Sequence, residues 1–285
     1  MRPPPIASAT SPPAPRPGSR ASSGAPPTSP GSAPAAPAAP APPAPGGSTR
    51  PLAVRSRPLR ATVQVALWSP DGVRDGVPLP LLAVHDGPEY ERQTGLTARA
   101  AELIGTGRVP PHRIALLDPG HRDEWYSASA LYARALTDEL LPAIGRAVAV
   151  AGPPAGMGAS LGGLAMLHAQ RRAPDAFSGL FLQSASFFMP RFDHMEKGFP
   201  RYGRIVRFVR GVLRDDGFEA PVPVTLTCAG AEDNVHNNRR VTAALRLQGY
   251  RAALVETPGG HDFDTWGAAL DPHLEDLLTA AWRER

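Results

Sequence analysis

The segment Gly156-Met157-Gly158-Ala159-Ser160-Leu161-Gly162-Gly163 decides how the rest of the chain is interpreted. Inside it, residues 158–162 have the form G-x-S-x-G, which is typical of a serine on a sharp turn between a strand and a helix. The turn forces Ser160 into a strained backbone conformation, and the glycines two positions to either side leave room for the helix to pack against the strand. A serine hydroxyl is a poor nucleophile at pH 7 and needs a base and a group that orients this base. The rest of the chain has to supply both, because the motif alone also fits a serine that merely caps a helix.

Strand-like and helix-like segments alternate on both sides of this motif. Short β-branched or apolar runs predict strands at 62–68, 81–84, 113–117, 179–182, 222–227 and 252–255. Helical periodicity predicts helices at 96–105, 127–144, 161–171, 202–213, 237–247 and 263–282. Only residues 155–157 remain for a strand before Ser160, because Pro153 and Pro154 interrupt the chain there. This alternation predicts an α/β fold, a mostly parallel sheet with helices on both faces.

The first 58 residues have a different composition from the rest. About half of the 35 prolines of the chain lie there, among Ala, Ser and Gly, with almost no large apolar side chain to bury. No apolar run of the kind found in a signal peptide follows Arg2. We therefore predict a disordered tail over 1–58 and one catalytic domain over 59–285.

Charge and cysteine content narrow the class of protein. Seven of the 30 basic residues lie at or before Arg60, whereas the first acidic residue is Asp71. The residues after Arg60 include 23 basic and 26 acidic ones, so their net charge is about −3, whereas that of the whole chain is +4. A basic surface for nucleic acid is therefore not indicated on this part. No stretch approaches the ~20 apolar residues of a membrane span. Cys228 is the one cysteine, which excludes an internal disulfide and favours a cytoplasmic location.

Two later loops can supply the partners that Ser160 needs. His261 lies in a glycine-flanked loop just after the predicted strand at 252–255, and Glu232 and Asp233 follow the strand at 222–227. This order of serine, carboxylate and histidine is the one that the strand-to-helix serine turn requires. Asp233 is preferred as the group that orients His261, because it lies further beyond the strand end, and Glu232 is the alternative.

The chain contains four short motifs in a fixed order: His-Asp-Gly-Pro-Glu-Tyr at 85–90, Arg-Asp-Glu-Trp-Tyr at 122–126, Gly-Ala-Ser-Leu-Gly-Gly at 158–163 and Gly-Gly-His-Asp-Phe at 259–263. Together they resemble the putative-esterase family, and most of all its enterochelin esterase-like branch. S-formylglutathione hydrolases, feruloyl esterases and mycolyltransferases also belong to this family.

The resemblance covers roughly residues 60–282 and implies an α/β-hydrolase that cleaves a small-molecule carboxylic ester through an acyl-serine, without a cofactor. Carried over by position, Ser160 matches the nucleophile, His261 the general base and acid, and Asp233 the orienting carboxylate. Acyl transfer to an alcohol, as in the mycolyltransferases, is an alternative, and a non-catalytic binding protein on the same fold is another.

An oxyanion needs backbone N–H donors close to the serine. The amide of Leu161, directly after Ser160, is the first candidate. The second should come from the loop after the strand at 81–84, where Pro88 has no N–H and Gly87 is the candidate.

Other polar and aromatic residues leave two interpretations open. Arg122 and Glu124 can contact substrate or form a structural ion pair. The aromatic segment 187–202 can line a substrate pocket or pack under its own loop. His85 is expected to be structural, and the histidines show no metal-binding spacing, so no metal is predicted.

Overall fold

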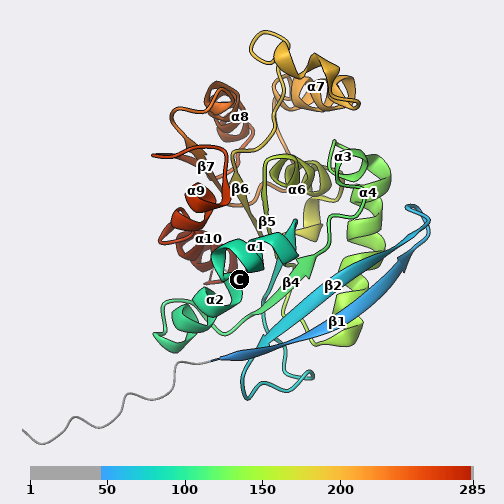
Figure 1. The fold of residues 1–285 in the computed structure, drawn as a ribbon, viewed down its shortest axis with the longest axis vertical. Helices are drawn as coiled ribbons and strands as arrows, with labels where there is room; N and C mark the ends of the chain where they lie inside the picture. Colours follow the sequence, from blue (N-terminus) through green and yellow to red (C-terminus); the bar gives the residue numbers. More distant parts are fainter. Residues whose placement is uncertain (1–45, 284–285) are drawn as a thin grey trace, which may run out of the picture. The chain divides into compact units, whose positions relative to one another are not determined.

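An eight-stranded sheet forms the centre of residues 46–283, the part of the chain that this computed structural model describes (Figure 1). Its strands are β1 (Gly47–Ser56), β2 (Ala61–Pro70), β3 (Leu81–Val84), β4 (Arg113–Leu117), β5 (Ala155–Ala159), β6 (Gly179–Gln183), β7 (Val224–Ala229) and β8 (Ala252–Thr257). Their order across the sheet is β1-β2-β4-β3-β5-β6-β7-β8. The pairs β1–β2 and β2–β4 are antiparallel, and all the remaining pairs are parallel. The prediction of a mostly parallel sheet is confirmed.

Helices cover both faces of this sheet. They are α1 (Gly87–Thr94), α2 (Leu96–Gly105), α3 (Arg122–Trp125), α4 (Ala130–Ala135), α5 (Leu141–Ala147), α6 (Leu161–Arg172), α7 (Tyr202–Val212), α8 (Val235–Leu247), α9 (Phe263–Ala268) and α10 (His273–Arg283). Three shorter helical turns are η1 (Leu136–Leu140), η2 (Pro174–Ala176) and η3 (Met195–Gly198). Apolar residues of α4, α6, α7 and α8 form the core on one face, and those of α1, α2, α9 and α10 form the core on the other.

The central strand β4 shows how one short apolar run serves both cores. All five of its residues are buried. Ile114 and Leu116 pack in the core with α2 and α10, whereas Ala115 and Leu117 pack in the opposite core. Successive side chains of a strand point to opposite faces, so the strand is apolar on both faces from Ile114 to Leu117. Arg113, at its start, is buried as well and donates to the carbonyl oxygens of Val77 and Ala149.

Strand β1 corrects the predicted boundary of the N-terminal tail. It pairs with β2 along its whole length, from Gly47 opposite Pro70 to Ser56 opposite Ala61. The prediction of a tail up to residue 58 is therefore wrong for residues 47–58, while residues 1–45 lie outside the described part. Most of β1 is exposed, so it carries little of the apolar pattern by which a strand is found in a sequence, and its position at the sheet edge tolerates Pro51.

The helix predicted at 127–144 is divided in the structure. The α-helix α4 begins after Ser129, whose hydroxyl accepts a hydrogen bond from the amide of Tyr132 at 3.4 Å. The chain then widens into the π-helical turn η1 and continues as α5. Among residues 46–283, no helix combines the length and the apolar character needed to cross a membrane.

Candidate active site

Ser160 occupies the turn that its motif predicts, between β5 and α6. Its backbone has φ 54° and ψ −123°, a conformation that side-chain-bearing residues rarely adopt. A Cβ atom on Gly158 would lie 2.6 Å from the carbonyl carbon of Gly162, so only glycine lets the helix approach the strand this closely. Strand β5 has five fully buried residues and is longer than the three-residue strand expected from Pro153 and Pro154.

The predicted site residues gather at the carboxyl edge of the parallel strands. Gly87 follows β3, Ser160 follows β5, Glu232 follows β7 and His261 follows β8. Ligands of open α/β sheets bind at this edge, because the loops that follow the strands meet there. A cavity of about 680 Å³ opens there, and it is lined among others by Arg122, Ser160, Leu161, Ser186, Phe188, Phe199, Glu232, Asp233 and His261.

Glu232 is the carboxylate that contacts His261. Its Oε2 lies 2.7 Å from Nδ1 of His261. An ionised carboxylate can only accept, so Nδ1–H of the imidazole donates and Nε2 is left free to take a proton. The preference for Asp233 is wrong in this structure, because the exposed Asp233 lines the cavity without a hydrogen bond to His261.

The turn after β7 explains why the nearer residue takes this position. The side chain of Glu232 folds back toward the strand end, where Oε1 accepts from the amide of Ala229 at 3.0 Å and from the hydroxyl of Ser184 at 2.6 Å. Only 5% of this side chain is exposed. Burial opposes its charge, but hydrogen bonds from His261, Ser184 and Ala229 outweigh burial and hold the pKa of Glu232 below its usual value.

Ser184 supports the carboxylate and was not found from the sequence. Its hydroxyl donates to Glu232 and accepts from Nε1 of Trp266 at 3.0 Å. The ring of Trp266 also packs edge-on against His261, with the ring centroids 5.1 Å apart. Ser184 lies directly after β6 with φ 45°, and its place at a strand end is the one signal that points to it.

A second serine beyond β6 contacts Ser160 directly. The Oγ atoms of Ser160 and Ser186 lie 3.0 Å apart, and the amide of Ser186 donates to the carbonyl oxygen of Ser160 at 3.1 Å. Ser186 is only 5% exposed and lines the same cavity as His261. The structure therefore shows Ser160 with its hydroxyl bonded to Ser186, a partner that the sequence did not indicate.

The loop between β3 and α1 is held by a buried polar network. His85 is fully buried, with Nδ1 2.9 Å from the carbonyl oxygen of Gly162 and Nε2 2.9 Å from the hydroxyl of Tyr132. A carbonyl only accepts, so Nδ1 carries the proton and Nε2 accepts from Tyr132. Burial lowers the pKa of His85 to about 3, which keeps the ring neutral at pH 7. The expected structural role of His85 is confirmed.

Gly87 and Leu161 have different places at the site. Leu161 lines the cavity and is the first residue of α6, so its N–H has no partner within the helix. Gly87 is the first residue of α1 and is not among the residues that line the cavity. A Cβ atom on Gly87 would lie 2.3 Å from Cα of Leu116 in β4, so this glycine is needed for the close packing of the loop.

Arg122 and Glu124 belong to separate ion pairs and do not pair with each other. Nε and Nη2 of Arg122 donate to the two carboxylate oxygens of Asp86 at 2.8 and 2.9 Å, and Arg122 also lines the cavity. Glu124 pairs with Arg201 and, at 2.7 Å, with Arg204. Glu124 is not among the residues lining the catalytic cavity, so of the two only Arg122 can reach a substrate there.

The aromatic segment 187–202 fulfils both roles considered for it. Phe188 and Phe199 line the cavity and pack edge-to-face, with centroids 6.1 Å apart. Phe187 is fully buried in the core. The segment thus supplies an aromatic wall and anchors that wall by its own buried side chain.

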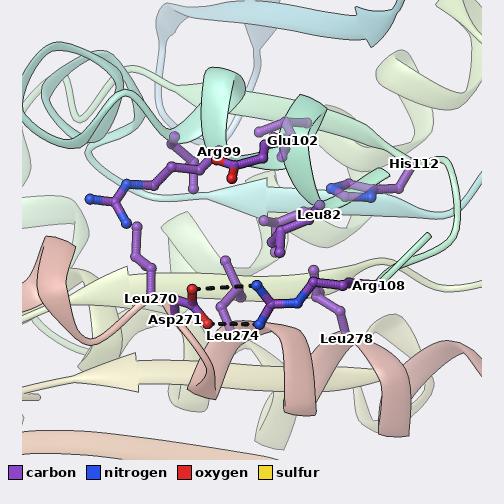
Figure 2. Close-up of a pocket in the computed structure, with 13 residues that line it drawn as sticks. Leu82, Arg99, Glu102, Arg108, His112, Leu270, Asp271, Leu274 and Leu278 are labelled. Carbon is purple, nitrogen blue, oxygen red and sulfur yellow. Dashed lines mark hydrogen bonds and ion pairs between the residues drawn. The ribbon is translucent and has the colours of Figure 1, made fainter. Parts of the chain in front are cut away.

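A second, much smaller cavity lies away from this site, between α2 and α10 (Figure 2). Its volume is about 60 Å³, enough for one or two waters and too little for an ester substrate. Leucines such as Leu82, Leu274 and Leu278 line it, and Arg108 pairs with Asp271 at its margin (Figure 2). Within residues 46–283, no three or more His, Cys, Asp or Glu side chains are grouped to hold a metal ion.

Known proteins match most of the chain. The family described as Putative esterase matches residues 56–277. The Iron(III) enterobactin esterase of Dickeya dadantii (strain 3937) is 28% identical over 208 residues, which are 70% of this chain and 48% of that protein. The chain therefore spans about half the length of this curated relative.

Solved structures share the fold. A ferulic acid esterase superposes with a TM-score of 0.70 at 19% identity and covers 83% of this chain and 98% of its own. The enterobactin esterase of Shigella flexneri, solved in the presence of enterobactin, gives 0.67 at 21% identity over 83% of this chain and 59% of its own. An IroE-like serine hydrolase from Shewanella oneidensis gives 0.63 at 17% identity over 80% and 79% of the two chains. These likenesses identify the fold as that of the α/β-hydrolases.

Proposed function

The chain belongs to the putative esterase family, and we propose that it hydrolyses carboxylic esters through an acyl-serine formed on Ser160. The observation that carries this proposal is the bond between Glu232 and His261 at the cavity that also contains the strained Ser160. A nucleophile on a strained turn, a histidine with one nitrogen bonded to a carboxylate and a shared cavity are the parts that acyl transfer by serine requires.

In the proposed reaction, His261 takes the proton of Ser160 while Oγ attacks the ester carbonyl carbon. The hydroxyl of Ser160 leaves its bond to Ser186 at this step and turns to Nε2 of His261. Glu232 keeps Nδ1 protonated and stabilises the imidazolium that forms. His261 then gives the proton to the leaving alcohol as the C–O bond breaks, and the same histidine activates the water that releases the acid.

The negative charge that develops on the carbonyl oxygen needs preorganised donors. We assign the amide of Leu161 as the first donor, since it lines the cavity and lacks a helical partner. Gly87 stays the candidate for the second donor. Arg122 also lines the cavity, where its guanidinium is paired with the carboxylate of Asp86 and can still offer N–H donors to a substrate oxygen.

The relatives suggest which esters to test first. The Dickeya protein is named as an esterase of iron(III) enterobactin and a solved relative as a ferulic acid esterase. We propose the enterobactin type of ester as the leading substrate class, supported by the sequence identity and by the aromatic wall of Phe188 and Phe199. A panel of enterobactin, ethyl ferulate and p-nitrophenyl butyrate, compared by kcat/KM, tests this choice.

Loss of the nucleophile tests the mechanism. The parent protein should hydrolyse short p-nitrophenyl esters, and Ser160→Ala should reduce kcat by about 10³-fold or more. A fluorophosphonate should label the parent on Ser160 and leave the variant unlabelled. Full activity of Ser160→Ala would show that Ser160 is not the nucleophile and that the reaction does not pass through an acyl group on this residue.

We further propose a cytoplasmic location, supported by the cysteine content alone. The single thiol of Cys228 is 1% exposed, and burial, followed by the charge of Glu232, raises its pKa to about 12. A thiol kept protonated and buried does not form disulfides readily. Cell fractionation with an antibody against the chain checks this, and recovery outside the cytoplasm would contradict it.

A further inference from the structure

Another large cavity lies between helices α4, α6 and α7, and four arginines line it. Its volume is about 730 Å³, within the range of small-molecule sites. We call it the arginine cleft, defined by Arg171, Arg172, Arg204 and Arg207 together with Phe208 and Phe218. Figure 1 shows α4 and α6 together, with α7 beyond them. The arginine cleft shares none of its lining residues with the catalytic cavity.

Two of the four arginines build the wall of the cleft. Arg171 has a side chain only 9% exposed; it bonds to Gln248 at 2.7 Å and pairs with Asp215. Arg204 pairs with Glu124 at 2.7 Å and donates to the carbonyl oxygen of Ser127 at 2.5 Å. Asp215 and Glu124 are the only acidic residues that line the cleft. Both are thus already engaged.

The other two arginines are exposed and face no acid. Neither Arg172 of α6 nor Arg207 of α7 has a hydrogen bond or ion pair to a residue within 46–283. With the two acids matched by the wall arginines, these guanidiniums leave the cleft with two uncompensated positive charges. His168 adds none, because burial and then the charges of Arg172 and Arg204 lower its pKa to about 4. The cleft is therefore suited to an anion.

Apolar surface lies beside these charges. The ring of Phe208 packs edge-on against His168, with centroids 4.9 Å apart. Phe218 lies under the guanidinium of Arg171 at 4.7 Å, and Leu131 is 58% exposed although it lines the cleft. Sites for small organic molecules combine such apolar walls with a few placed polar groups. A purely inorganic anion would use the arginines and leave the rings unused.

We propose that the arginine cleft is a second ligand site, which binds a small organic anion that joins a carboxylate to an aromatic or aliphatic group. The anion bonds to the guanidiniums of Arg172 and Arg207, and its apolar part packs on Phe208, Phe218 and Leu131. Two planar forks on different helices give the site its selectivity for a carboxylate. The ligand is separate from the ester cleaved at Ser160, so this site does not depend on the proposed function.

Binding of 2-naphthoate to the full chain carrying Ser160→Ala, measured by isothermal titration calorimetry, tests the proposal. The double substitution Arg172→Gln with Arg207→Gln should raise the Kd of 2-naphthoate about tenfold or more, because it removes hydrogen bonds from charged donors to the carboxylate. Arg55→Gln with Arg146→Gln is the matched control, because it removes the same charge from exposed positions outside the cleft. The control should bind as the parent does.

Two further probes separate charge from apolar contact. Uncharged 2-naphthamide and inorganic phosphate should each bind more weakly than 2-naphthoate. The proposal would be overturned if the parent did not bind 2-naphthoate, or if the double variant bound it as tightly as the parent does. It would also be overturned if the control variant lost as much affinity as the double variant.

Activity separates this test from that of the proposed function. In the background that keeps Ser160, the double variant should hydrolyse p-nitrophenyl esters at the parental rate, because neither arginine lines the catalytic cavity. Its circular dichroism should match that of the parent. A double variant that folds, keeps its esterase activity and loses 2-naphthoate affinity supports a separate site.

Discussion

The two sides of the catalytic cavity are held in different ways. On the side of β7 and β8, Glu232 and His261 face each other with the carboxylate buried and the imidazole 44% exposed toward the cavity. On the side of β3, His85 and Asp86 are buried and bonded to protein groups, and the cavity is lined instead by Arg122 and Asp123 of α3. On the first side, the Glu232–His261 pair is therefore available for proton transfer. On the second side, Asp86 and Arg122 neutralise each other, and this ion pair stabilises the loop after β3. Substitutions on the first side should change rates, and those on the second should change stability.

The largest effect is expected from Glu232→Gln. The amide keeps the shape but can no longer stabilise the imidazolium of His261, and kcat should fall by about 10³- to 10⁴-fold. Asp233→Asn is the matched control and should keep kcat within about twofold, since Asp233 makes no bond to His261. Ester hydrolysis by the purified variants measures both. A larger loss with Asp233→Asn than with Glu232→Gln would break the assignment.

Acid should act on the β3 side through His85. The folded protein keeps His85 neutral down to a pKa of about 3, while the unfolded chain takes up a proton near the usual 6.5. The unfolded state therefore binds more protons between these values, and stability falls as the pH drops below about 6.5. This residue contributes up to about 1.4 kcal/mol per pH unit.

Urea unfolding at pH 7, 6, 5.5 and 5 measures this dependence. Buried His112 and His168, with pKa values of about 4, add to the same trend. His85→Gln should lower the slope of unfolding free energy against pH, whatever its effect on stability at pH 7. An unchanged slope would show that His85 is not the neutral, buried group described above.

Asp86→Asn should destabilise the β3 loop by about 2 kcal/mol, because it leaves Arg122 partly buried without its carboxylate. Asparagine tolerates the left-handed conformation of this position (φ 51°), so the change reports on charge more than on backbone strain. Glu89→Gln, which breaks the exposed pair with Arg92, should cost about 0.5 kcal/mol or less. If urea unfolding gave the same loss of stability for Asp86→Asn and Glu89→Gln, the ion pair of Asp86 with Arg122 would not stabilise the β3 side more than an exposed pair does.

A smaller loss of activity is expected from Ser184→Ala, about 1 kcal/mol in the activation free energy, which corresponds to roughly fivefold in kcat. Loss of this donor raises the pKa of Glu232, so the acidic limb of the pH–rate profile should move to higher pH. Ser186→Ala removes the contact to Ser160 and leaves Glu232 untouched, so its acidic limb should stay in place. The same displacement in both variants would mean that Ser184 does not act through Glu232.

Local patterns in the sequence predicted the turn that holds Ser160, the loop that carries His261 and a mostly parallel sheet, and the structure contains all three. The sequence did not distinguish Glu232 from Asp233, since the direction of each side chain in a turn depends on its tertiary contacts, and here Ser184 and Ala229 bond to Glu232. Ser186 was missed for the same reason, because its contact with Ser160 joins two strands through the tertiary fold.

Strand β1 also escaped detection, and it has a practical consequence. A shortened protein that began at residue 59 would lose all ten residues of β1. Strand β2 would then become the edge of the sheet, with its backbone groups open to pairing with other chains. Val63 would lose its partner Val54, and Val65 would lose Leu52. Such a protein would keep Ser160, Glu232 and His261 and still be prone to aggregate. A shortened protein that began at residue 46 would keep all eight strands described above.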